Sequence, residues 1–384
     1  MNTPYHRLGD YIREVNIRNR DLKVTKLVGL TIDKAFIPSV ANVIGTDLSN
    51  YKVIRKEQFA CSLMQVSRDG KMPIAMFEED EAIMSPAYPM FEVVDKTMLM
   101  PQYLMMWFSR SEFDREASYY AVGGVRGSLT WEDFCNMRLP VPTLSRQREL
   151  VAEYATLTNR IRLNEQMIAK LEETAQALYR KMFVEGVDKE RLPEGWRMGT
   201  IENICEVKDG THDSPKPVEC GFPLVTSAHL SSWSVLLDQA YCISSHDFNK
   251  INERSLVENK DILFSMIGTV GSISFVLYEE INFAVKNMAI FKTSHKLEYA
   301  EYILFFLKSE EMDAYIAGSI SGSTQNYVTL NTLRETPIVI PESRQVKIFH
   351  KSASTIVSQI WNYTKENEKL TELQSLLLAK MGNM

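Results

Sequence analysis

The chain has 384 residues, of which 45% are hydrophobic and 24% charged, a balance typical of globular proteins with two or more domains. It contains no apolar run of about eighteen residues and no apolar signal-peptide core, so we expect a cytoplasmic protein rather than a membrane or secreted one. The formal net charge of −6 argues against a uniformly basic nucleic-acid-binding protein.

The charge differs between the two halves of the chain. Residues 1–184 hold 24 Lys and Arg against 23 Asp and Glu, and the remainder holds 19 against 26. Several basic side chains lie in one short N-terminal segment, where Arg20 and Lys26 are candidates for contact with DNA phosphate. Any contact with DNA must therefore use local basic patches, with a basic partner subunit supplying the rest of the charge.

The first 143 residues consist of short apolar runs broken by Gly, Pro and Asn, which predict strands, then one helix-like run and a strand ending in proline. A loop rich in glycine precedes that strand and contains Arg126 and Ser128. A long helix follows, whose apolar residues recur at alternating spacings of four and three from Leu150 to Met182. Asn164 interrupts this apolar seam.

A polar linker separates this half from a second half with the same order of elements. Tyr103–Phe113 matches Tyr302–Met312, and the long helix recurs with an apolar seam from Phe349 to Met381 that Asn367 interrupts. A repeat unit this long indicates duplicated domains rather than a solenoid. The expected segments are a first globular domain at 1–143, a central helix at 144–184, a linker at 185–195, a second globular domain at 196–341 and a distal helix at 342–384.

The two long helices predict a coiled coil. If they pack antiparallel in full overlap, Leu150 meets Met381 and Asn164 falls opposite Asn367, an arrangement that fixes the register because any slip buries an unpaired amide. The alternative is that each helix packs only on its own globular domain. The expected fold class is thus α/β (α+β): two similar domains with small twisted β-sheets, each followed by a long helix of the antiparallel pair.

The motifs of several enzyme classes are absent. The string Ser85-Pro-Ala-Tyr88 lacks the amide and second proline of an amino-methyltransferase corner, and no phosphate-binding loop of a helicase or translocase is present. The acidic run Glu78–Glu81 is typical of a solvated loop. The five cysteines and six histidines lack metal-ligand spacing. We therefore predict no catalytic residue, no metal site and no cofactor in this chain.

Several strings are typical of one protein family. They are Asp209-Gly-Thr-His212 followed by Gly221–Val225, Ile267-Gly-Thr-Val-Gly271, Ser321–Asn326, the linker string Leu192–Trp196, and the Ser-Arg-Gln that opens each long helix after a proline-ended strand. With the repeat, they make the whole chain resemble the specificity subunit of type I restriction-modification enzymes, with two target-recognition domains. The first half departs from the strings of the second, which implies that the two domains read different half-sites.

The resemblance implies a non-catalytic DNA-binding subunit that recognises a bipartite target in double-stranded DNA. Two methyltransferase subunits would dock on the helices, restriction and translocase subunits would join them, and S-adenosylmethionine, ATP and magnesium would bind to those partners. Polar and basic side chains suit contacts with phosphates and base edges. The candidates in the globular domains are Arg20, Lys26, Arg126, Ser128, Thr211, His212, Lys216, Ser323, Thr324, Gln325 and Asn326.

Two alternatives remain open. One is a two-headed adaptor or scaffold that binds proteins rather than DNA, which the net acidity favours. The other is an enzyme with an unrecognised site, such as an unusual nuclease, which would cleave DNA by itself in the presence of a metal ion. The salt dependence of DNA binding distinguishes a DNA-binding subunit from an adaptor, because contacts with phosphate release counterions.

Overall fold

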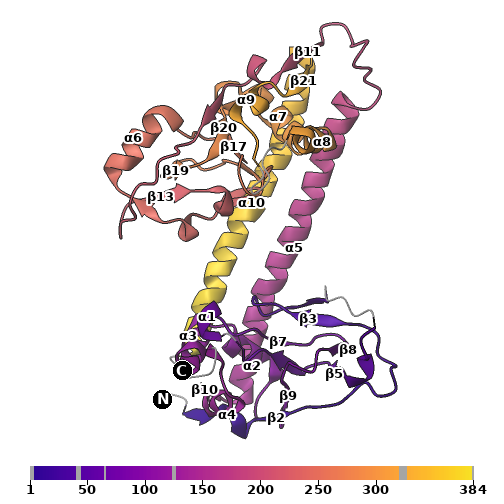
Figure 1. Ribbon diagram of the computed structural model, residues 1–384, viewed down its shortest axis with the longest axis vertical. Helices are drawn as coiled ribbons and strands as arrows, with labels where there is room; N and C mark the ends of the chain where they lie inside the picture. Colours follow the sequence, from indigo (N-terminus) through magenta and orange to yellow (C-terminus); the bar gives the residue numbers. More distant parts are fainter. Residues whose placement is uncertain (1–3, 40–44, 65, 123–126, 320–326, 383–384) are drawn as a thin grey trace. The chain divides into compact units, whose positions relative to one another are not determined.

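The computed structural model describes residues 4–39, 45–64, 66–122, 127–319 and 327–382. The chain divides into two compact units, the first made of residues 1–161 with 369–384 and the second of residues 162–368. The division falls inside the two long helices, α5 (Leu144–Phe183) and α10 (Ser343–Met381), which Figure 1 labels. Each unit therefore contains part of both helices.

The first unit is organised around an antiparallel four-stranded sheet with the strand order β2-β9-β6-β7. Its strands alternate with polar turns, and their apolar side chains join the helices in one buried cluster. Three further strand pairs, β1-β10, β3-β4 and β5-β8, complete the unit. The elements are β1 (Tyr5–Arg7), β2 (Ile12–Glu14), β3 (Val28–Leu30), β4 (Phe36–Pro38), β5 (Lys52–Arg55), β6 (Phe59–Cys61), α1 (Val66–Asp69), β7 (Ile74–Met76), β8 (Glu81–Met84), β9 (Met90–Val93), α2 (Pro101–Phe108), α3 (Ser111–Ala121), α4 (Trp131–Asn136) and β10 (Arg138–Pro140).

The second unit contains a four-stranded antiparallel sheet with the equivalent order, β12-β20-β17-β18. A three-stranded sheet, β16-β13-β19, and the pairs β11-β21 and β14-β15 accompany it. The elements are β11 (Arg197–Thr200), β12 (Val207–Asp209), β13 (Phe222–Val225), β14 (Leu230–Ser231), β15 (Ser234–Val235), β16 (Cys242–Ile243), α6 (Ser245–Ser255), β17 (Ile262–Ser265), β18 (Ile273–Phe275), β19 (Ala284–Val285), β20 (Met288–Phe291), α7 (Ala300–Leu307), α8 (Glu310–Ser319), α9 (Leu330–Arg334) and β21 (Pro337–Ile340).

Matching side-chain contacts recur in the two units. The buried Tyr103 hydroxyl donates to the carbonyl of Pro140 at 3.0 Å, and the buried Tyr302 hydroxyl donates to the carbonyl of Val339. The N-cap of α4 is Thr130 and that of α9 is Thr329, and each hydroxyl accepts a hydrogen bond from the backbone three residues later. The repeat in the sequence therefore corresponds to the same arrangement of elements and contacts in both units.

Both long helices contribute to the second unit. Asn164, which is 1% exposed, donates from Nδ2 to Asn367 Oδ1 and to Glu366 Oε2, at 2.9 Å in each case. Farther along α5, the ring of Phe183 lies 5.2 Å from that of Phe349 on α10. Residue numbers rise along one helix as they fall along the other, so the two segments are antiparallel within this unit.

The first unit contains the opposite ends of the same helices. Gln374 Nε2 donates to Thr158 Oγ1 at 2.7 Å, and Leu150 and Met381 are fully buried in the same cluster. Arg110, which stacks on Trp107, donates to a carbonyl of the last turn of α10 at 3.1 Å. The C-terminal part of each helix thus completes a core whose sheet lies elsewhere in the sequence.

We predict that Asn367→Leu lowers the free energy of unfolding by about 1–3 kcal/mol, because it leaves a buried Asn164 N–H without its Asn367 acceptor. The double variant Asn164→Leu/Asn367→Leu should regain most of this loss, since apolar partners at a seam position restore packing. Urea unfolding followed by circular dichroism measures both. A single variant as stable as the native chain would contradict the prediction.

Candidate nucleic-acid interface

In the second unit, the strand register brings several connecting segments to one end of the four-stranded sheet. Asp209 pairs with Ala289, which pairs with Phe264, which pairs with Ile273. The end of β12, the start of β20, the end of β17 and the start of β18 therefore lie together. We call the segments that meet there, residues 210–216, 266–272 and 286–287, the loop end of the second unit.

The first unit has an equivalent loop end. Glu14 pairs with Phe91, and Cys61 pairs with Ile74, so the segments after β2, between β6 and β7, and before β9 meet at the same end of its sheet. In each unit the chain that leads to α4 or α9 then packs on the turn that joins the last two strands in the sheet order, β6-β7 or β17-β18. Leu129 N donates to the carbonyl of Leu63 at 2.8 Å, and Val328 N donates to that of Met266 at 3.0 Å.

Several predicted DNA-binding residues lie at these loop ends. In the second unit, Thr211 is buried, whereas His212 and Lys216 are exposed. In the first unit, Ser128 is half-buried next to the backbone contact of Leu129. Arg126, Ser323, Thr324, Gln325 and Asn326 lie outside the described residues.

The two basic candidates near the N-terminus have partners within the first unit. Arg20 donates to Asn50 Oδ1 at 3.1 Å, and Lys26 forms an ion pair with Glu79 from the acidic run. Glu81 of that run lies 3.8 Å from Arg55. Within the described part of the chain, no group of three or more His, Cys, Asp or Glu side chains is placed to hold a metal ion. A phosphate would have to compete with Glu79 for Lys26.

The loop that follows β12 is attached to the turn between β19 and β20 by backbone hydrogen bonds. Gly210 N donates to the carbonyl of Met288 at 2.9 Å, Thr211 N donates to that of Val285 at 3.0 Å, and Asn287 N donates to that of Thr211 at 3.0 Å. A Cβ on Gly210 would lie 2.9 Å from the Val285 carbonyl oxygen. The glycine of the Asp-Gly-Thr-His string is therefore required for close backbone approach.

Lys286 and Asn287 in that turn were not among the residues predicted from the sequence. The Lys286 ammonium donates to Ser214 Oγ, and Asn287 adopts a positive φ of 55° beside His212. Asn tolerates this conformation better than most residues, which is a weak signal for a turn. No local pattern indicates that the turn meets a loop about 75 residues earlier in the chain.

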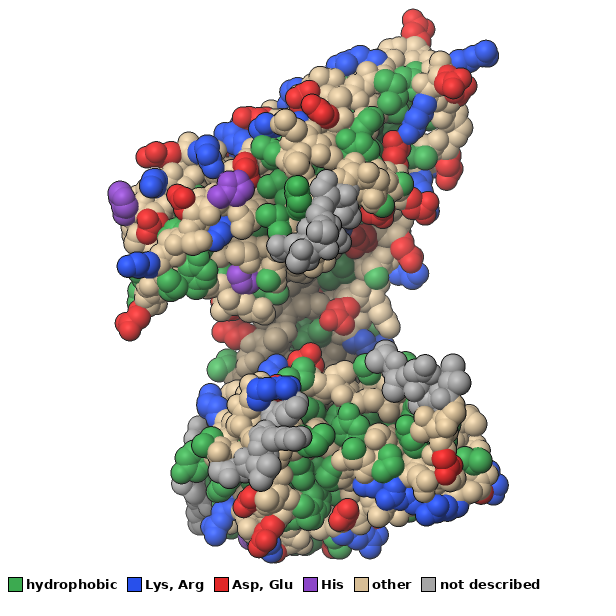
Figure 2. Space-filling model, in the orientation of Figure 1, with side chains coloured by type: hydrophobic (Ala, Val, Ile, Leu, Met, Phe, Trp, Pro, Cys, Tyr) green, Lys and Arg blue, Asp and Glu red, His purple; other side chains and the backbone are tan. Residues whose placement is uncertain are grey.

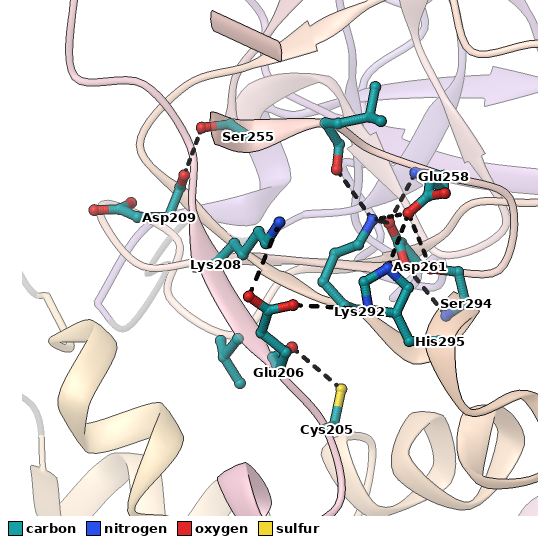
Figure 3. Close-up of polar contacts among 12 residues, drawn as sticks. Cys205, Glu206, Lys208, Asp209, Ser255, Glu258, Asp261, Lys292, Ser294 and His295 are labelled. Atoms are coloured by element: carbon teal, nitrogen blue, oxygen red, sulfur yellow. Dashed lines mark hydrogen bonds and ion pairs between the residues drawn. The ribbon is translucent and has the colours of Figure 1, made fainter. Parts of the chain in front are cut away.

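A buried ion cluster lies next to this sheet in the second unit. Lys292 Nζ, on a side chain 1% exposed, donates to Asp261 Oδ2 at 2.5 Å, to Glu258 Oε2 at 2.7 Å and to the carbonyl of Leu256 at 3.0 Å (Figure 3). The hydrogen bond from Lys292 holds the pKa of Glu258 below its usual value. Three acceptors satisfy the three ammonium hydrogens, so the cluster serves the fold rather than a ligand.

Charges of both signs are mixed on the face of the second unit that Figure 2 shows. Figure 2 shows basic and acidic side chains interspersed on the visible face of the second unit, with no broad field of either sign.

Within the described ranges, no helix combines the length and apolar content that crossing a membrane requires.

Comparison with known proteins identifies the family. The family model of the type I restriction modification DNA specificity domain matches residues 193–376. The specificity subunit of the type I restriction enzyme MjaIX from Methanocaldococcus jannaschii is 21% identical over 318 residues, covering 75% of this chain and 70% of that subunit. Residues 193–376 therefore match the DNA specificity domain of type I restriction-modification systems, and the chain as a whole is similar to their specificity subunits. Specificity subunits are the non-catalytic, DNA-recognising component of these systems.

Other specificity subunits extend this likeness. That of the HindI enzyme from Haemophilus influenzae is 24% identical over 227 residues, which are 56% of this chain and about half, 48%, of that subunit. The crystal structure of the S subunit from M. genitalium matches with a TM-score of 0.57 and 12% identity, covering 99% of this chain and 96% of that one. The resemblance predicted from the sequence is confirmed, and the specificity-subunit fold spans both units.

Proposed function

We propose that this chain is the subunit that selects the DNA target of a type I restriction-modification system, with each unit reading one half of a bipartite site. The observation that carries the proposal is that the same sheet occurs twice while the segments at its two loop ends differ in sequence. A repeated scaffold with divergent loops suits two readers of different half-sites, because loops on a rigid sheet can vary without loss of the core.

The long helices hold the two readers in this proposal. The antiparallel contacts in each unit are consistent with one coiled coil along α5 and α10, in which Asn164 and Asn367 fix the register. The exposed faces of these helices would receive two methyltransferase subunits, and restriction subunits would join for cleavage. S-adenosylmethionine, ATP and magnesium would bind to those partners, since sequence reasoning finds no site for them in this chain.

The experiment that tests the proposal is co-expression of the chain with its methyltransferase partner, followed by mapping of modified adenines in the host genome at single-base resolution. We expect modified adenines within two short half-sites separated by a fixed gap. An assembled complex that leaves the genome unmodified would contradict the proposal and favour a scaffold function.

A salt titration of the same complex on duplex DNA provides a second measurement. The logarithm of the association constant should fall linearly with the logarithm of salt concentration, with a slope of about −0.9 for each phosphate neutralised. An adaptor that binds only proteins would leave the labelled DNA unshifted at every salt concentration. Metal-dependent cleavage by the chain alone would favour a nuclease.

A further inference from the structure

The turn between β19 and β20 presents two polar side chains beside the predicted His212. Lys286 and Asn287 are both half-buried, and residue 286 pairs with Thr211 in an isolated parallel bridge. Two of the three backbone hydrogen bonds described above form this bridge, and with the third they hold the turn and the loop as one rigid surface. Side chains on such a surface are positioned before a ligand arrives, which reduces the entropy lost on binding.

Hydrogen bonds on two sides orient the imidazole of His212. Its Nδ1 lies 2.9 Å from Asn287 Oδ1 and its Nε2 lies 2.8 Å from Asp209 Oδ2. Since both nitrogens face oxygen acceptors, the ring satisfies both only as the imidazolium. The bonds to Asn287 and Asp209 raise the pKa of His212 above its ordinary value of 6.5. The side chain is nevertheless 61% exposed, so its outer face is open to a ligand.

The charges around His212 come from several elements. Asp209 ends β12, Arg254 lies on α6, Lys286 lies on the turn, and Asp213 follows in the loop. Ser255 Oγ donates to the backbone carbonyl of Asp209 at 2.7 Å and fixes that residue from behind (Figure 3). The imidazolium and the Lys286 ammonium are two cationic groups on the surface formed by the loop and the turn, which suits an anionic backbone.

Asn287 has the chemistry to read a base. His212 occupies its Oδ1, which leaves the amide NH₂ to donate to an acceptor on a base edge, such as N7 or O6 of guanine. In this arrangement His212 and Lys286 would bind phosphate, and the amide of Asn287 would distinguish bases.

We propose that Lys286, Asn287 and His212 contact the second half-site as one unit, with Asn287 determining specificity and Asp209 positioning His212. This inference rests on the proposed function. DNA affinity should then fall as pH rises through the pKa of His212, because the neutral ring no longer donates from both nitrogens and no longer carries a positive charge.

The test uses the full chain assembled with its methyltransferase partner and a duplex carrying the target found by adenine mapping, together with duplexes altered in one half-site. Asn287→Ala should reduce discrimination at one position of the second half-site by about tenfold, with the first half-site unaffected. Lys286→Ala should weaken binding to every sequence and reduce the salt slope by about one.

The pH profile of binding tests the positioning role. Asp209→Asn should shift the loss of affinity to lower pH without a change in melting temperature, and His212→Gln should remove this pH dependence. His246→Gln, an exposed histidine on α6, is the matched control and should leave the profile unchanged. If Asp209→Asn unfolds the unit, His212→Gln alone still provides the test.

Two failures are distinguishable. If the native complex discriminates no half-site, the proposed function is overturned. If the native complex discriminates both half-sites while Asn287→Ala and His212→Gln behave like it in discrimination and pH profile, the present inference alone is overturned.

Discussion

Replacement of Lys292 by methionine is expected to lower the free energy of unfolding of the second unit by about 3–5 kcal/mol. The substitution removes the cation that bonds to Asp261, whose side chain is fully buried. Asp261 keeps a backbone donor, Glu258 N at 2.7 Å, but loses its counterion. A buried charge without its partner costs far more than the net stabilisation that the pair contributes.

Amide exchange at β17 and β20 measures this loss within the second unit, because these strands lie in its core. The double variant Lys292→Met/Asp261→Leu is the control. It should recover part of the stability, since apolar replacements of a buried pair are tolerated, but not all, because the backbone N–H of Glu258 loses its acceptor. Equal stability of Lys292→Met and the native chain would show that the pair is open to water.

Gly210→Ala is expected to weaken binding of the second half-site by about 100-fold, because the base contact of Asn287 and the phosphate contacts of His212 and Lys286 would be lost together. The added Cβ would lie 2.9 Å from the Val285 carbonyl oxygen and 3.2 Å from that of Met288. Both neighbours are backbone atoms, so the loop must move away from the turn. His212 would then lose its alignment with Asn287.

Gly318→Ala provides a matched control in the same unit. A Cβ at Gly318, on α8, would meet no atom within 4 Å, and alanine in a helix is more stable than glycine by about 0.5–1 kcal/mol. This variant should bind DNA as the native chain does and melt slightly higher. Competition binding with duplexes altered in either half-site measures both variants. Undiminished discrimination by Gly210→Ala would contradict the role of the loop.

Local patterns predicted much of this fold. The apolar seams of α5 and α10 and the duplicated order of elements were visible in the sequence. Each depends on interactions between residues close in the chain or on a regular helical spacing. The Asp-Gly-Thr-His string pointed to His212, although not to the groups that orient it.

The site itself depended on strand register. Nothing near Lys286 in sequence indicates that it lies beside Thr211, because that contact follows from the pairing of β12 with β20. The ion pair between Lys26 and Glu79 likewise joins residues that are distant in the chain. Contacts of this kind form only when nonlocal strands pair, so no periodic pattern records them.

The sequence by itself determined the repeat and the helical seams with their two asparagines, because these are local or periodic properties of the chain. Only the tertiary structure decided which segments meet at each loop end and how the helices are shared between the units. Those arrangements depend on long-range pairing and burial, in which each residue's partner is selected by the whole fold rather than by its neighbours in sequence.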